Sequence, residues 1–202
     1  MQISSNSPGI LSAGESFLQA EHYTYQKRAD GTLQVSGSID LARRGLKALP
    51  DLSDVVVTGD FHCQDNHLTS LKGAPREVHG GFWCNGNKLE TLEHTPERIT
   101  GQFVCHDNNL TTLAHAPAKI KGDFCCAGNP LASLEDAPRL FNSLRSDFGI
   151  FDSWEKIPEG LRLSPEANAA RLTAAAQEAT VLKGALRISK PLALKKPRPV
   201  SG

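Results

Sequence analysis

The sequence has no long apolar run, no surplus of charge of either sign and no paired cysteine motif, and each absence excludes a class of protein. None of its 202 residues belongs to an apolar stretch of about 18 residues, so no membrane-spanning helix is expected. Its 22 basic residues balance 22 acidic ones, which argues against a surface built as a whole for nucleic acid or anionic lipid. Five cysteines, an odd number without a CxxC pair, indicate reduced thiols and not a disulfide framework.

The dominant feature of the sequence is a repeat of 21 residues, whose units begin at Phe61, Phe82, Phe103 and Phe124. Five further columns recur without a gap at this spacing: Cys63, Cys84, Cys105 and Cys126; Asn66, Asn87, Asn108 and Asn129; Leu68, Leu89, Leu110 and Leu131; Leu71, Leu92, Leu113 and Leu134; and Pro75, Pro96, Pro117 and Pro138. A preceding unit of 22 residues begins at Ile39 and keeps the apolar positions. Such a repeat indicates coils that bury their apolar faces by stacking on one another.

The repeated pattern Phe-x-Cys-x-x-Asn-x-Leu-x-x-Leu resembles the leucine-rich repeat, with phenylalanine and cysteine at two of the usual leucine positions. The resemblance covers five coils, residues 39–144. It implies an α/β-type repeat solenoid, a short horseshoe with a parallel β-sheet on its concave face. It also implies that each repeated Asn turns inward and bonds backbone groups that no strand satisfies.

The strand segments predict which side chains face outward. Residues 57–63 alternate with a period of two and predict one continuous strand, with Phe61 and Cys63 facing the core. The outward positions of successive coils then form a grid on the concave face. Its columns are Asp60, Gly81, Gln102 and Asp123; His62, Trp83, Val104 and Cys125; and Gln64, Asn85, His106 and Ala127.

Trp83 is the candidate anchor of a protein-binding surface on this grid. An exposed aromatic side chain among polar and small residues is typical of a binding hot spot. The alternative is that Trp83 packs against the side chains of a cap. The predicted partner-binding residues are Trp83, His62, Val104, Gln64, Asn85, His106, Gln102, Asp60 and Asp123.

The segment before the repeat is expected to divide into a tail and a cap. Residues 1–20 are export-signal-like or disordered, and they lack the basic start and apolar core of a cleaved signal peptide. Within them, Ser12 and Glu15 have the spacing of a helix-capping box. Residues 21–38 predict a capping hairpin around the Asp30-Gly31 turn, which would cover the first open strand edge.

The segment after the repeat is expected to hold a C-terminal cap and helix, residues 145–186, and a basic disordered tail, residues 187–202. The apolar cover of the cap is assigned to Phe148, Phe151, Trp154, Ile157 and Leu161. The helix would take Ser164 as its N-cap and Pro165 as its first residue, and would end near Gly184. Its apolar face would consist of Leu172, Ala175, Ala179 and Leu182.

No catalytic, cofactor-binding or metal-binding residue is predicted, and the protein is not expected to be an enzyme. The repeated cysteines would lie along a line, whereas zinc needs its ligands around one point, so we interpret them as small apolar core residues. Cys125 alternates outward and is a candidate exposed thiol. His62 and His106 lack a column of carboxylates or hydroxyls that would complete an acid-base site.

The coil pattern NxLTSLxGAPxxVxG, which residues 66–80 display, resembles the short leucine-rich repeats of bacterial type III secreted effectors and related prophage proteins. The resemblance implies a non-catalytic scaffold that type III machinery secretes into a host cell and that binds a host protein through its concave face. The serine-rich, acid-poor start of the chain resembles an uncleaved export signal of this kind. Larger members carry an E3 ubiquitin ligase domain, for which the 58 residues after Leu144 are too few.

The alternative function is a cytoplasmic bacterial or prophage-encoded inhibitor or adaptor of a defence or regulatory protein. For both functions we expect a monomer with a protein partner, no small-molecule substrate and no cofactor. A third hypothesis assigns nucleic-acid binding or nuclear import to the basic residues 195–198, for which a solvated tail is the favoured interpretation.

Overall fold

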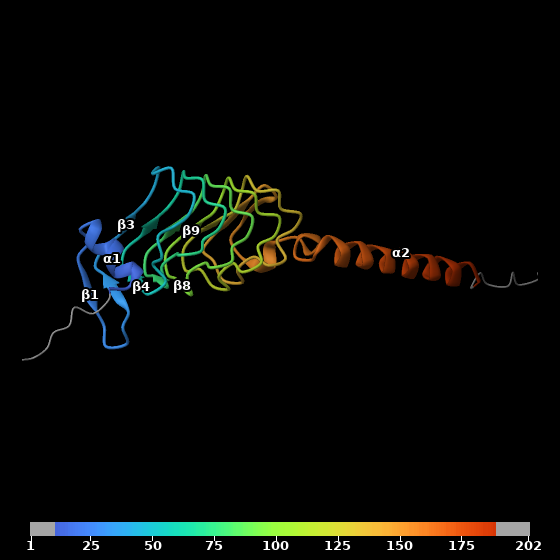
Figure 1. Cartoon of the computed structure of the whole chain (residues 1–202). Helices are drawn as coiled ribbons and strands as arrows, with labels where there is room; N and C mark the ends of the chain where they lie inside the picture. The colour runs from blue at the N-terminus through green and yellow to red at the C-terminus, as the bar shows by residue number, and fades with distance from the viewer. Residues whose placement is uncertain (1–10, 189–202) are drawn as a thin grey trace, which may run out of the picture.

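The protein is a β-solenoid of stacked parallel strands, which confirms the predicted repeat solenoid. The structure, a computed structural model, describes residues 11–188. Figure 1 shows the coils side by side, with α1 and β1 at one end of the stack and α2 leading away from the other. The described chain between Ile39 and Leu144 contains no helix, so the α/β-type prediction is wrong for the coils themselves.

The coils contribute strands to two sheets. The seven-stranded sheet has the order β12-β11-β10-β9-β7-β5-β3, and its neighbours are parallel except for β11 and β12. Its strands are β3 (Ile39–Asp40), β5 (Phe61–His62), β7 (Phe82–Trp83), β9 (Phe103–Val104), β10 (Phe124–Cys125), β11 (Leu144–Ser146) and β12 (Gly149–Phe151). The five-stranded sheet has the order β1-β2-β4-β6-β8. Its strands are β1 (Tyr25–Lys27), β2 (Leu33–Val35), β4 (Val55–Val57), β6 (Glu77–Val78) and β8 (Arg98–Ile99).

The two sheets correct the prediction of one continuous strand per coil. β4 ends at Val57 and β5 begins at Phe61, with a bend at residues 58–60 between them. Successive coils touch at this bend, which is why glycine recurs there: a Cβ on Gly101 would lie 2.5 Å from the carbonyl carbon of Gly80. The predicted directions of the side chains hold, because Phe61 is buried while His62 remains partly accessible.

The core is a set of ladders that run through the stack. The four repeated phenylalanines are fully buried, and their ring centroids lie 5.3, 5.8 and 5.6 Å apart from one coil to the next. The repeated cysteines and both repeated leucine columns pack around them, with Leu131 only partly buried in the last coil. Each buried side chain of this size contributes about 1.5–3 kcal/mol to stability. The stacking of neighbouring coils, which buries these side chains, is therefore the main source of stability in the repeat.

The repeated asparagines are buried and bond the backbone, as the sequence predicts. The Nδ2 of Asn87 donates to the carbonyls of Cys84, 3.1 Å away in its own coil, and of Cys63, 3.0 Å away in the preceding one. Its Oδ1 accepts from the backbone N–H of Leu68 at 3.0 Å. Asn108 and Asn129 repeat these bonds one and two coils later, so each amide ties two neighbouring coils together.

The N-terminal flank is ordered from the start of α1 (Ala13–Ala20), which corrects the disordered interpretation for that part of residues 1–20. The Ser12 hydroxyl accepts from the Glu15 N–H at 3.0 Å and caps the helix, as the spacing predicts. Leu18 is fully buried in the core, and this contact holds the helix in place. The predicted hairpin is present: β1 and β2 pair antiparallel, and β2 pairs with β4 in the five-stranded sheet.

The C-terminal flank continues after the last coil with β12, η1 (Trp154–Lys156) and η2 (Glu159–Leu161). Ile157 is buried, and Phe151, Trp154 and Leu161 pack against the core. Phe148 is an exception, because its side chain is exposed at the turn between β11 and β12. The guanidinium carbon of Arg139 lies 3.5 Å from the centroid of the Trp154 ring, a cation–π contact.

Helix α2 (Pro165–Ile188) begins where the sequence predicts, with the Ser164 hydroxyl accepting from the Ala167 N–H at 3.1 Å. Three residues of its predicted apolar face are not buried, since Leu172 is 56% exposed and Ala175 and Ala179 are exposed as well. The fourth, Leu182, has a side chain outside the described part of the helix. The side chains that pack against the core at this end come from the elements before α2, and α2 itself projects from the stack (Figure 1). The helix continues past the predicted end into residues 187–188, and the rest of the predicted tail, including residues 195–198, lies outside the described residues.

No helix within residues 11–188 combines the length and the apolar character that crossing a membrane requires.

Candidate functional site

The register of the seven-stranded sheet places His62, Trp83, Val104 and Cys125 in one row. Trp83 lies opposite His62 on one side and Val104 on the other, and Cys125 follows Val104. The row arises because alternate residues of each strand point inward to the phenylalanine ladder, which leaves these side chains on the outer face. Arg145 continues the row on β11, opposite Cys125.

Trp83 packs within this row. Its ring stacks on the imidazole of His62, with centroids 4.5 Å apart and planes 17° from parallel. A Cβ on Gly81 would clash with the indole ring, so glycine at this position makes room for Trp83. The equivalent positions of the next two coils hold Gln102 and Asp123, whose side chains would not leave room for an indole. The ring is therefore held in one place by its neighbours in the repeat while part of it stays accessible.

Beside Trp83 the outer face is hollowed into a groove of about 490 Å³, here called the row groove. Seven of the nine predicted partner-binding residues line it: Gln64, Trp83, Asn85, Gln102, Val104, His106 and Asp123. The other two lie next to the groove: His62 stacks on Trp83, and the Asp60 carboxylate accepts from the Gly81 N–H at 2.8 Å. The structure thus brings the predicted grid together on one surface.

Four residues that line the groove were not among the predicted binding residues: Arg43, Asp65, Cys125 and Arg145. Arg145 could have been found by extending the grid one coil further, since it occupies the position after Cys125 in the register. Arg43 and Asp65 were missed because both adopt positive φ angles, 57° each, and an alternating strand pattern says nothing about side-chain direction at such a turn.

Val104 contributes less surface than predicted. Its side chain is only 8% exposed, although it occupies an outward position. It is flanked in register by the larger Trp83 and by Cys125, and a short β-branched side chain between such neighbours is shielded from solvent. Val104 forms part of the floor of the groove, and the accessible surface belongs to the longer side chains around it.

Charges of both signs surround the groove. The Arg43 guanidinium pairs with the Asp65 carboxylate, Nε to Oδ2 3.0 Å. A hydrogen bond of 2.7 Å from the Asn142 amide is the main reason that the pKa of Asp123 is lowered from its ordinary value, so this carboxylate is ionised at neutral pH. Within the described residues, the buried Gln64 Oε1 has no hydrogen-bond partner.

The cysteines provide no activated thiol. Cys63, Cys84 and Cys105 are fully buried, and burial raises the pKa of each thiol well above its ordinary value. Burial raises the pKa of Cys126 to about 12, and it also raises the pKa of the half-buried Cys125 at the groove. All five thiols are therefore protonated at neutral pH. Among residues 11–188, no group of three or more His, Cys, Asp or Glu side chains is arranged to hold a metal ion.

The arrangement is suited to recognition of a polar partner that also offers an apolar contact. An aromatic ring held by its neighbours loses little conformational freedom on binding, and the amide, carboxylate and guanidinium groups around it supply directional bonds. The chain matches no protein-family model, no curated protein and no solved structure.

Proposed function

We propose that the protein is a non-catalytic binding protein that engages a protein partner through the row groove. The observation that carries the proposal is the Trp83 ring, stacked on His62 at 4.5 Å, seated over Gly81 and partly accessible beside the groove. Interface hot spots are enriched in tryptophan, and they lie in surroundings that exclude water from a central aromatic contact. The strand that carries Trp83 also carries Phe82, whose ring is buried in the phenylalanine ladder beneath this surface.

In this proposal the solenoid is a short leucine-rich-repeat horseshoe whose concave face is the seven-stranded sheet. The buried asparagine ladder, with its bonds to the carbonyls of two successive coils, supports that interpretation. The β1–β2 hairpin acts as the N-terminal cap, and β12 with η1 and η2 acts as the C-terminal cap. The two caps protect the open ends of the stack from pairing with other chains.

The test is a comparison of partner capture by the intact protein and by Trp83→Ala. If Trp83 is the anchor, its truncation weakens capture by about 2 kcal/mol or more, roughly thirtyfold in Kd. Phe148→Ala is the matched control, because it removes an exposed aromatic side chain that does not line the groove. If the intact protein, Trp83→Ala and Phe148→Ala capture the partner equally well and unfold at the same temperature, the binding site does not include Trp83.

We further propose that the protein is a type III secreted effector whose partner is a host protein. The resemblance of residues 66–80 to effector repeats and the serine-rich start of the chain support this step. Deletion of residues 2–10 tests it, since that deletion spares the Ser12 cap and the buried Leu18 of α1. Secretion of the intact protein and loss of secretion on deletion are expected.

Retention of the intact chain inside bacteria that carry an active type III machine would favour the second candidate, a cytoplasmic or prophage-encoded inhibitor or adaptor. That function uses the same groove and requires the same Trp83 contact. The two candidates therefore differ in where the partner is found, and capture experiments on bacterial and host extracts separate them.

A further inference from the structure

The five-stranded sheet breaks between two neighbouring coils. Its parallel ladder is regular as far as β8: the N–H groups of Arg76 and Glu97 donate to the carbonyls of Val55 and Arg76, both at 2.9 Å. One coil later the equivalent N–H is that of Ala118, and within the described chain it makes no such bond to Glu97. Pairing resumes beyond the break, where Lys119 bridges to Leu140 and the Arg139 N–H donates to Ala118 at 3.0 Å.

A second rung of the ladder is missing at the same place. The His79 and Thr100 N–H groups donate to Val57 and Val78 in the preceding coils, at 2.8 and 3.2 Å. The Lys121 N–H is the equivalent donor, and its bond to the Ile99 carbonyl is absent among residues 11–188. The same two coils stay bonded in the seven-stranded sheet, where the Cys105 N–H donates to Cys125 at 2.8 Å. The break is therefore confined to one sheet, and within residues 11–188 it leaves strand-edge donors and acceptors without protein partners.

The charges explain why the ladder opens here. Glu77 and Arg98 are direct partners in register, which places opposite charges side by side. The next residue of that column is Lys119, so closing the ladder would place Arg98 directly against another cation. Like charges at such a position destabilise strand pairing. In the part of the chain that the structure describes, Arg98, Lys119 and Lys121 form no ion pair, whereas Glu97 is engaged by Arg76, Oε2 to Nε 3.4 Å.

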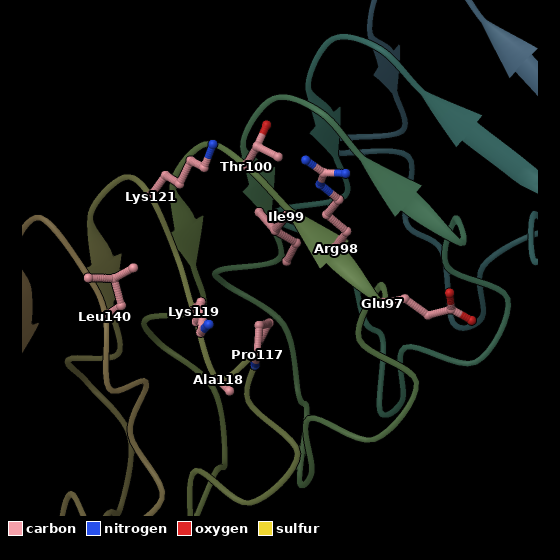
Figure 2. A pocket seen from close by; sticks show the side chains of 9 residues that line it. All are labelled: Glu97, Arg98, Ile99, Thr100, Pro117, Ala118, Lys119, Lys121 and Leu140. Carbon is pink, nitrogen blue, oxygen red and sulfur yellow. The ribbon is translucent and has the colours of Figure 1, made fainter.

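A groove of about 390 Å³ lies along the break. Figure 2 shows Arg98 and Ile99 on β8 at one side of it, and Lys119, Lys121 and Leu140 on the following coils. Leu140 is 54% exposed and supplies an apolar contact among the cations. This groove shares no lining residue with the row groove.

We propose that this groove binds an extended acidic peptide segment of a partner protein. The peptide pairs with the exposed edge of β8 through its backbone, as an added strand does at a sheet edge. Its carboxylates lie against Arg98, Lys119 and Lys121, which form no ion pair within the described chain, and neutralise their charge. Leu140 is the register partner of Lys119, so it lies on the same face as the cations. An apolar residue at a second-next position from a carboxylate points to that face of an extended peptide and contacts Leu140.

The test uses a fluorescein-labelled peptide of about seven residues, long enough to follow one strand edge, with Glu at its first, third and fifth positions, Val at its seventh and Ser between them. Its binding to the full chain is followed by fluorescence anisotropy. We expect Arg98→Glu and Lys119→Glu each to weaken binding about tenfold or more. Lys88→Glu, a charge reversal at an exposed site outside the groove, leaves peptide binding unchanged. Trp83→Ala also leaves it unchanged, because Trp83 does not line this groove. The test of this proposal is therefore independent of the test of the row groove.

Two further probes decide whether the peptide binds as a strand. Methylation of alternate peptide nitrogens abolishes binding if backbone pairing is used, and bound peptide slows hydrogen exchange at the Ala118 and Lys121 amides if the break is the site. The proposal is overturned if the methylated peptide binds equally well, if Lys119→Glu binds as the unmodified protein does, or if an oligothymidine of similar charge competes with equal affinity. The last result would assign the groove to polyanions in general.

Discussion

The two sheets of the solenoid are built by the same coils, yet one is continuous and the other is interrupted. The seven-stranded sheet runs from β3 to β12 without a gap, and the five-stranded sheet ends at β8. The continuous sheet lies over columns that hold the same residue in each full repeat, such as the buried phenylalanines. The interrupted sheet contains a column that changes from Glu77 to Arg98 to Lys119, and it opens where two cations would meet.

The difference shows which positions of a repeat maintain stacking. A buried column contributes at every interface between coils, so an identical residue at each step keeps the spacing uniform. An exposed column contributes only through the pair of side chains at each interface, and a pair of like charges there destabilises the ladder locally. The buried columns therefore hold the coils together even where one of their two sheets has separated.

The largest expected effect comes from breaking the phenylalanine ladder. The Phe103 ring lies between those of Phe82 and Phe124, at centroid distances of 5.8 and 5.6 Å. Phe103→Ala removes this ring and leaves a cavity between the other two. We expect a loss of about 3–5 kcal/mol in the free energy of unfolding, measured by chemical denaturation. Ile150→Ala is the control, because this side chain is 72% exposed, and its effect is expected within about 0.5 kcal/mol. A loss as small as that of the control would show that stacking does not depend on the ladder.

A smaller loss is expected from breaking the asparagine ladder beside the same sheet. Asn108→Ala removes an amide that bonds the carbonyls of Cys84 and Cys105 at 3.1 Å and the Leu89 N–H at 3.0 Å. Leaving these buried groups unpaired costs on the order of 1–3 kcal/mol. Asn109→Ala is the matched control, because the adjacent residue is exposed and has no side-chain bond within the described chain. Equal stabilities of the two variants would contradict the assigned role of the buried amide.

The same contrast explains what the sequence could predict. The identical columns fixed the solenoid, the buried asparagines and the outward row around Trp83, because each depends on the position of a residue within one repeat. The alternation also gave the correct directions for Phe61 and His62, but it could not reveal the bend between them, since alternation does not report which backbone groups pair. Burial of Val104 and exposure of Leu172 depend on neighbours from other coils and elements, which the repeat pattern does not contain.

A change that repairs the interrupted sheet should act in the opposite direction. Lys119→Glu places a carboxylate beside Arg98 and is expected to close the ladder, with a gain of up to about 1 kcal/mol in stability. The direct readout is hydrogen exchange: the Ala118 and Lys121 amides, which lack ladder bonds, should exchange more slowly in the variant. Lys88→Glu serves as the control. Unchanged exchange at both amides would show that charge is not the cause of the break.

The smallest expected effect is a pH dependence of stability at the N-terminal edge of the five-stranded sheet. The Lys27 ammonium on β1 hydrogen-bonds Glu15 of α1, Nζ to Oε2 3.0 Å, and this bond is the main reason that the pKa of Glu15 is lowered from 4.5. A lowered pKa contributes stability that is present above the unfolded value and is lost as the pH falls through the folded value. The difference in thermal unfolding between the unmodified protein and Glu15→Gln should therefore be largest near neutral pH and shrink below pH 4.5.

Glu90→Gln, at an exposed position, provides the control for this titration and should show no such trend. The bond joins α1 to the outer strand of the five-stranded sheet, so acid is expected to loosen that end of the molecule first. The amide ladder beside the seven-stranded sheet consists of neutral asparagines, which do not titrate in this range. Protection of the Cys84 and Cys105 amides should consequently persist at a pH where α1 and the hairpin have begun to exchange. Simultaneous loss of protection at both places would mean that the two sheets unfold as one unit.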